Sequence, residues 1–215
     1  MDAARSCSTL EPVNLVVTPD SSLTAGTNDF GRVTRQWVVA QFKACVTNDT
    51  WQHRFKEAEY KVDTDFNFGN RTQIQSATDP AITDSNCRAV LRDFTPSVSA
   101  YGIRIAPYSS YIPPTIISDH EAFHVTDYQA VVGTPLVAWM DNYGRNHGST
   151  QCKVPNPYQS AVADWTTERN RLDSTFNASN GHEVRAYAGE NASLATLTAA
   201  IRARAVTEGW RTQCQ

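Results

Sequence analysis

The pattern of the chain changes from strand-like to helix-like within one stretch, which reads Pro113-Pro114-Thr115-Ile116-Ile117-Ser118-Asp119-His120-Glu121-Ala122-Phe123-His124. Proline is tolerated in the first turn of a helix, so the two prolines suit a helix that begins here. Gly133 and Pro135 are typical of a helix end and predict that this helix stops near residue 133.

The residues before this helix read mostly as short extended segments separated by turn residues. Strands are expected over Pro12–Thr18, Trp51–Phe68 and Cys87–Phe94. Val33–Val46 is rich in β-branched and aromatic residues, and it fits either a strand or a short helix.

Two further helices are expected towards the end of the chain, over Pro157–Phe176 and Gly181–Val206. Their apolar stripes consist of Ala161, Trp165, Leu172 and Phe176 in the former and of Val184, Ala188, Leu194, Leu197, Ile201 and Ala205 in the latter. Strands first and helices second predict a single α+β domain, with residues 1–112 mostly strands and turns and residues 113–215 mostly helices.

The composition argues against two classes of protein. The 215 residues carry a formal net charge of -3, with no basic stripe of the kind that nucleic-acid binding requires. No segment has the roughly 18 consecutive apolar residues of a membrane-spanning helix. The first residues, Met1–Cys7, lack an apolar signal segment, so the chain fits a cytosolic protein, an unconventionally exported one or a piece of a longer polypeptide.

The pentapeptide 120–124 is an H-E-x-x-H motif, and its spacing has a direct chemical meaning. Residues four apart lie above one another on a helix, so the imidazoles of His120 and His124 reach one metal ion. Glu121 lies beside them, where a carboxylate can take a proton from a metal-activated water. With five histidines in 215 residues, the motif is expected by chance only about 0.004 times.

This segment resembles the active-site helix of the zincin metallopeptidases. The resemblance covers the motif helix and is specific to the superfamily rather than to one of its members. It implies that His120 and His124 bind Zn²⁺ and that Glu121 acts as the general base in peptide hydrolysis.

A catalytic zinc site normally has three protein ligands, so a third must come from elsewhere in the chain. The zincin variant that continues with a glycine and a third histidine is excluded, because residues 125–130 contain neither. A second variant uses the aspartate of a G-T-x-x-D pattern. Here Gly133-Thr134 is followed by Asp141, which is too late for that spacing.

A third variant places a glutamate on a later helix as E-x-x-A, and Glu183 to Ala186 fits this pattern, which makes the chain gluzincin-like. The small side chain of Ala186 would let this helix approach the metal closely. Tyr187 stands where several such families have an aspartate, and its hydroxyl could stabilise a developing oxyanion. Glu183 is therefore the favoured third ligand; the alternatives that stay open are His182, Asp141, His147 and Glu168.

Two further features have both a functional and a structural interpretation. Asp127 lies three residues after His124 and is either a carboxylate that orients a ligating histidine or a solvated helix residue. The aromatic run 101–111 could align a peptide substrate or simply pack in the core.

Five cysteines are spread along the chain without a C-x-x-C pair, which excludes a zinc ribbon and a thioredoxin-type motif. Since the motif assigns the metal to histidines and a carboxylate, the thiols are left for disulfides, and at least one is expected. The expected pairs are Cys45–Cys87 and Cys152–Cys214, with Cys7 spare; five unpaired thiols are the alternative. A secreted or periplasmic location is favoured over the cytoplasm.

Taken together, the residues and the resemblance predict a zinc-dependent endopeptidase that acts on proteins or peptides. One alternative is a zincin-derived effector or binding module that holds zinc without general proteolysis. The other is a structural or adhesive domain in which the motif is accidental and binds no metal.

Overall fold

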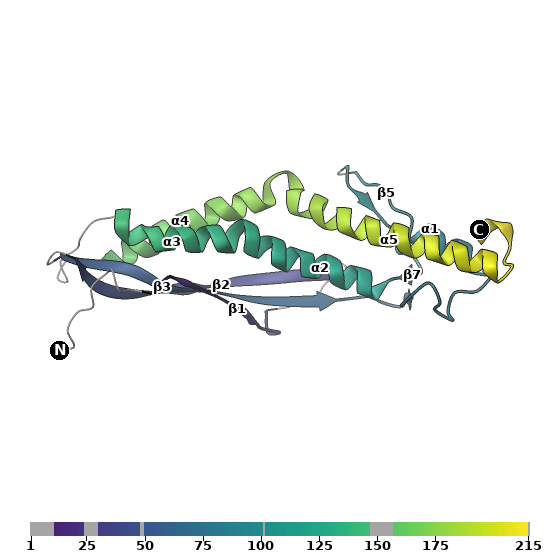
Figure 1. The fold of residues 1–215 in the computed structure, drawn as a ribbon, viewed down its shortest axis with the longest axis horizontal. Coiled ribbons are helices and arrows are strands. Elements are labelled where there is room, and N and C mark those ends of the chain that lie inside the picture. Colours follow the sequence, from purple (N-terminus) through teal and green to yellow (C-terminus); the bar gives the residue numbers. More distant parts are fainter. Residues whose placement is uncertain (1–10, 24–29, 48–49, 101, 147–156, 215) are drawn as a thin grey trace. The chain divides into compact units, whose positions relative to one another are not determined.

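The computed structural model describes residues 11–23, 30–47, 50–100, 102–146 and 157–214. The chain divides into two compact units. The first consists of Met1–Thr24, Thr34–Asp63 and Thr126–Ser179, and the second of Ala25–Val33, Thr64–Val125 and Asn180–Gln215. The fold is α+β, as predicted, with the long strands in the N-terminal half and the long helices in the C-terminal half (Figure 1).

The main sheet contains three strands in the order β1-β3-β2. They are β1 (Asn14–Pro19), β2 (Gly31–Thr47) and β3 (Thr50–Phe66). The short β1 runs parallel to β3, with Asn14 opposite Glu57 and Pro19 opposite Val62. The strands predicted over Pro12–Thr18 and Trp51–Phe68 are confirmed, and Val33–Val46 proves to be a strand.

In the first unit, aromatic side chains of the sheet and the helices pack together. The ring centroid of Trp37 on β2 lies 4.9 Å from that of Tyr60 on β3 and 6.0 Å from that of Trp165. Trp165 belongs to α4 (Pro157–Asn177), which confirms the helix predicted over Pro157–Phe176. The predicted stripe of α4 is buried as expected: Ala161, Trp165, Leu172 and Phe176.

The predicted end of the motif helix near Gly133 is wrong. Helix α2 (Pro114–Tyr128) continues through a π-helical turn, η2 (Gln129–Gly133), into α3 (Thr134–Asn146) (Figure 1). Gly133 has a packing role instead, because a β-carbon there would lie 2.9 Å from Cδ2 of Leu15 on β1. Pro135 lies just after this π-helical turn; it cannot donate the usual backbone hydrogen bond to residue i−4, and a π-helical turn is a common local interruption of that hydrogen-bond ladder.

The second unit contains short strands and helices around the amino-terminal part of α2. Strand β4 (Thr72–Gln73) pairs in parallel with β7 (Tyr111–Ile112). Strand β5 (Ser97–Val98) pairs antiparallel with β6 (Arg104–Ile105).

Residues 87–94, predicted to form a strand, form helix α1 (Cys87–Asp93) and its cap, so that prediction is wrong. The apolar residues are spaced at intervals of three and four, which is the period of one helix face. All of them are buried: Cys87, Val90, Leu91 and Phe94.

Helix α5 (Gly181–Thr207) matches the helix predicted over Gly181–Val206. It follows a short 3-10 turn, η3 (Ala178–Asn180), in which Ser179 and Asn180 have left-handed backbone angles. The predicted apolar stripe is wrong for its first two members, since Val184 and Ala188 are exposed. The buried face of α5 consists of Ala186, Glu190, Leu194, Ile201 and Ala205.

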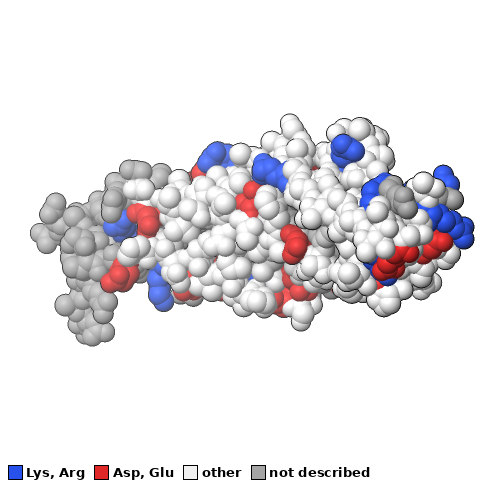
Figure 2. All heavy atoms as spheres, turned by 45° about the vertical axis from the view of Figure 1, so that its right-hand side comes forward, with Lys and Arg blue, Asp and Glu red and all other residues white. Residues whose placement is uncertain are grey.

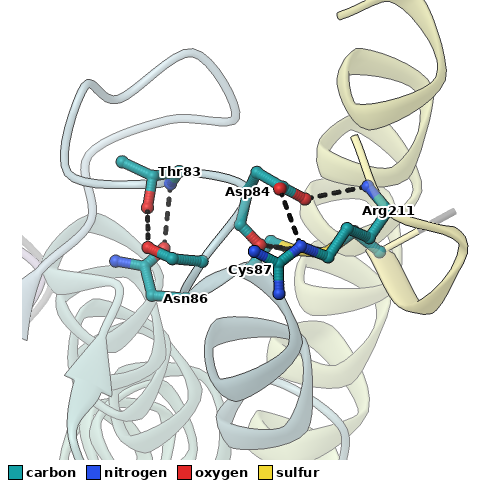
Figure 3. The surroundings of a disulfide bond; sticks show 7 residues. Thr83, Asp84, Asn86, Cys87 and Arg211 are labelled. Carbon is teal, nitrogen blue, oxygen red and sulfur yellow. Dashed lines mark hydrogen bonds and ion pairs between the residues drawn. A yellow bond between two sulfur atoms is a disulfide. The ribbon is translucent and has the colours of Figure 1, made fainter. Parts of the chain in front are cut away.

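A disulfide joins Cys87 of α1 to Cys214 of the C-terminal turn η4 (Thr212–Cys214) (Figure 3). Asp84 lies beside it and accepts hydrogen bonds from the backbone N–H and from Nε of Arg211, at 2.8 and 3.0 Å. The predicted pairs Cys45–Cys87 and Cys152–Cys214 are both wrong, because each assigns another partner to a cysteine of this bond. Cys45 is disulfide-bonded as well.

The remaining cysteines of the prediction, Cys7 and Cys152, lie outside the described residues. The observed disulfide joins two cysteines that both belong to the hydrophobic core of the second unit. The other buried residues of this core are Ile74, Ile82, Val90, Leu91, Phe94, Ala106, Tyr108, Ile112, Ile117, Leu194, Ile201 and Ala205.

On the face shown in Figure 2, positive and negative side chains are interspersed rather than gathered by sign. Two of the ion pairs of the second unit, Arg204–Glu208 and Arg211–Asp84, bring opposite charges together at 2.7 and 3.0 Å. Among the helices of the described residues, none has the length and apolar character that crossing a membrane requires.

Candidate metal centre

The structure brings together the two motif histidines and Glu183. His120 and His124 lie one turn apart on α2, with their Nε2 atoms 3.1 Å from each other. Glu183 lies in the first turn of α5, with Oε2 3.7 Å from Nε2 of His120 and Oε1 3.6 Å from Nε2 of His124. The two imidazoles therefore present one nitrogen each, and Glu183 its carboxylate, to the same point.

These separations fit a bound metal ion. A tetrahedral ion with bonds of about 2.0–2.2 Å to nitrogen and oxygen places its ligand atoms about 3.3–3.6 Å apart. The observed separations of 3.1, 3.6 and 3.7 Å lie close to this range. His120, His124 and Glu183 thus form a group that could hold a metal ion. Two imidazoles and a carboxylate suit zinc and its neighbours better than magnesium or calcium.

The electrostatics of the site also favour a cation. Glu121 and Glu190 are buried near the two histidines, and Glu183 is half-buried. The nearby imidazoles of His120 and His124 hold the pKa of Glu183 well below its ordinary value. Burial opposes a charge on His120, yet contacts with Glu183 and Glu190 outweigh burial and raise the pKa of His120 to about 9. In the metal-free site a proton thus supplies the positive charge that the carboxylates attract.

Glu121 occupies space that a glycine leaves open. A β-carbon at Gly31, the first residue of β2, would lie 2.6 Å from both Cγ and Oε1 of Glu121. Only a residue without a side chain leaves room for the carboxylate in this position. Burial raises the pKa of Glu121 despite the opposing influence of His120 and His124, which suits a group that takes and returns a proton.

Glu190 is the site residue that the sequence interpretation missed. Its Oε2 lies 2.7 Å from Nδ1 of His120, and its Oε1 accepts a hydrogen bond of 2.7 Å from the hydroxyl of Tyr108. The available signal was its spacing, since residues seven apart, like Glu183 and Glu190, share one face of a helix.

Tyr187 also lies at the site. Its ring packs edge to face against the imidazole of His120, with 4.6 Å between the ring centroids. It follows Glu183 by one turn of α5, so the same helix carries both side chains to His120. The predicted role of its hydroxyl towards an oxyanion stays a prediction.

The alternative third ligands differ in their contacts: His182 lies beside the group, whereas Asp141 and Glu168 bond to other residues. His182 adjoins the group, with Nε2 3.4 Å from Oε1 of Glu183 and its ring 5.5 Å from that of His124. Asp141 belongs to the first unit, where its carboxylate accepts a hydrogen bond of 2.7 Å from the backbone N–H of Val13. Glu168 forms an ion pair with Arg171 on α4. His147 lies outside the described residues.

The structure also locates Asp127 and the aromatic residue Tyr108. Asp127 is half-buried on α2, and its predicted role towards a motif histidine stays a prediction, whereas Glu190 makes such a contact. In the run 101–111, Tyr108 is buried against Phe30 and Phe94, so its ring belongs to the core.

Comparison of the chain with protein-family models, with curated proteins and with solved structures gives no match. The function is therefore inferred from the H-E-x-x-H motif and from the geometry around it.

Proposed function

We propose that the protein is a zinc-dependent endopeptidase of the zincin type. The observation that carries the proposal is the convergence of Nε2 of His120, Nε2 of His124 and the carboxylate of Glu183, at separations of 3.1–3.7 Å. His120, His124 and Glu183 would hold the ion and leave a position open for water and substrate. A bound Zn²⁺ would polarise the scissile carbonyl and lower the pKa of the attacking water to about 7.

Glu121 would then transfer the protons of the reaction. Glu121 takes a proton from the water as its oxygen attacks the carbonyl carbon, and returns it to the amide nitrogen as the C–N bond breaks. The products are a carboxylic acid and an amine, which at neutral pH are a carboxylate and an ammonium ion. Tyr187, beside His120, would donate a hydrogen bond to the negatively charged oxygen that develops during the attack.

The substrate class follows from the same chemistry. Metal-assisted attack of water on a carbonyl suits the amide bonds of a protein or peptide, which we propose as the partner. The disulfide between Cys87 and Cys214 favours an oxidising compartment, so we propose that the enzyme works outside the cytoplasm, as a secreted or periplasmic protein.

Glu121→Gln tests the proposal directly, because the amide has nearly the shape of the carboxylate and cannot take a proton. The variant is expected to bind one equivalent of zinc, like the wild type, and to lose hydrolysis of an unfolded protein substrate. His124→Ala is expected to lose both the metal and the activity. Persistent hydrolysis by Glu121→Gln would contradict the mechanism.

The same measurements separate the alternative functions. Stoichiometric zinc with no cleavage across a broad peptide library would favour a binding or effector module. Absence of zinc from the purified wild type, and failure to take it up, would favour a structural domain.

A further inference from the structure

Glu190 contacts His120 on the side of the ring that faces away from the proposed metal position. Its Oε2 is 2.7 Å from Nδ1, whereas Nε2 of the same imidazole faces His124 and Glu183. The Glu190 side chain is only 2% exposed, so water does not screen the contact. Glu190 therefore touches a ligand without being one of the three converging groups.

Tyr108 holds the other oxygen of this carboxylate. Its hydroxyl donates a hydrogen bond of 2.7 Å to Oε1 of Glu190, and the residue is 1% exposed. Burial and the charge of Glu190 raise the pKa of Tyr108 far above its ordinary value, so the hydroxyl stays protonated and remains a donor. One oxygen of Glu190 thus accepts this hydrogen bond, and the other lies 2.7 Å from Nδ1 of His120.

The backbone that carries Tyr108 is fixed in an uncommon conformation. Tyr108 has a φ of 41°, in the left-handed region that a bulky side chain rarely adopts, and such a conformation persists only where the surroundings impose it. Asp93, at the end of α1, supplies this restraint. Its Oδ2 accepts hydrogen bonds from the N–H groups of Ser110 and Tyr111, at 2.6 and 3.0 Å.

We propose that Glu190, held by Tyr108, is a positioning residue that orients His120 for metal binding. This inference rests on the proposed function in one respect, namely that His120 binds a metal ion. A carboxylate at Nδ1 selects the tautomer with its proton on that nitrogen and leaves the lone pair of Nε2 for the ion. Because the carboxylate is fixed by a buried tyrosine, the ring is also prevented from rotating.

The affinity for Zn²⁺ tests the inference without depending on catalysis. It would be measured by competition with a chromophoric chelator at fixed pH, for the full-length wild type and for Glu190→Gln and Tyr108→Phe. Removing a carboxylate behind a ligating histidine is expected to weaken zinc binding about 10- to 100-fold. Tyr108→Phe keeps the ring packing and leaves the carboxylate in place, so we expect a smaller loss.

Glu208→Gln is the matched control, since it removes the same charge at the exposed end of α5, where Glu208 pairs with Arg204. Its zinc affinity is expected to equal that of the wild type. A second readout is the proton on Nδ1 of His120 in a ¹⁵N-labelled, zinc-loaded sample. A downfield resonance in the wild type, lost in Glu190→Gln, would support the inference.

Wild-type affinity in both Glu190→Gln and Tyr108→Phe would overturn the inference while leaving the proposed function intact. If Glu190→Gln does not fold, as judged by circular dichroism, Tyr108→Phe alone decides: a weakened affinity supports the inference and an unchanged one overturns it. A wild type that binds no zinc would overturn both proposals.

Discussion

Gly31 and Glu121 lie so close that no side chain fits between them: a β-carbon at position 31 would be 2.6 Å from Cγ and Oε1 of the glutamate. Gly31→Ala must therefore displace the proposed general base. We expect the variant to retain zinc and to lose kcat by roughly 10²-fold, the size of effect that a misplacement of about 1 Å produces. Zinc content and initial rates on a peptide substrate provide the measurement.

The control for this variant is Gly189→Ala on α5, where a β-carbon would meet nothing within 4 Å. Its activity is expected to match the wild type. A Gly31→Ala enzyme with full activity would show that Glu121 does not need its observed position.

The third ligand can be identified by comparing two adjacent residues. Glu183→Ala removes the carboxylate that lies 3.6–3.7 Å from both histidines and is expected to abolish stable zinc binding. His182→Ala removes a ring that contacts Glu183 at the edge of the group, and is expected to leave the zinc stoichiometry unchanged. Metal analysis after dialysis distinguishes the two, and the reverse pattern would make His182 the ligand.

Asp93 is expected to be important for stability rather than for catalysis. It is fully buried and accepts hydrogen bonds from the N–H groups of Ser110 and Tyr111. Asp93→Ala leaves these donors without their partner and should lower the free energy of unfolding by about 1–3 kcal/mol or more. Urea unfolding measures the change; Asp119→Ala, an exposed aspartate on α2, should stay within about 0.5 kcal/mol of the wild type.

The disulfide Cys87–Cys214 joins residues 127 positions apart. Its removal is expected to lower the free energy of unfolding by about 2–5 kcal/mol. Cys87→Ser, Cys214→Ser and the double variant should lose nearly the same amount, because each breaks the same bond. Losses that add up in the double variant would mean that the two cysteines are not bonded to each other. Peptide mapping without reduction provides an independent check.

The stability of the metal-free protein should depend on pH through His120. Its pKa rises from an ordinary 6.5 to about 9 in the folded state, because contacts with Glu183 and Glu190 outweigh burial. A raised pKa means that the protonated ring stabilises the fold fully below pH 6.5 and loses this effect as the pH rises through 9. Thermal unfolding of chelator-treated protein between pH 6 and 10 should show Tm falling over this window.

Zinc should reverse that dependence, since metal binding needs neutral histidines and becomes stronger as protons leave. The stabilisation produced by added zinc is therefore expected to increase from pH 6 to pH 8. A Tm of the metal-free protein that stays constant between pH 6.5 and 9 would contradict the assigned His120 contacts.

The amino-acid sequence alone was sufficient to predict those features of this protein that depend on short-range periodicity. His120 and His124 face the same way because any helix places residues four apart on one side, and the pattern that identified Glu183 is likewise local to one helix turn. Strands β1 and β3 and helix α4 were predictable for the same reason, whereas residues 33–46 fitted either a strand or a short helix and only the structure shows strand β2 there. Where the local period was misread, as in residues 87–94, the prediction of a strand failed.

The tertiary structure decided everything that joins distant segments. Gly31 lies against Glu121, Tyr108 against Glu190, and Cys87 bonds Cys214, although each pair is separated by more than eighty residues. Gly133 was predicted to end a helix, but its role is in packing: without a side chain, it leaves room for Leu15. No local pattern encodes such contacts, because they arise only when the whole chain packs and buried polar groups must find partners.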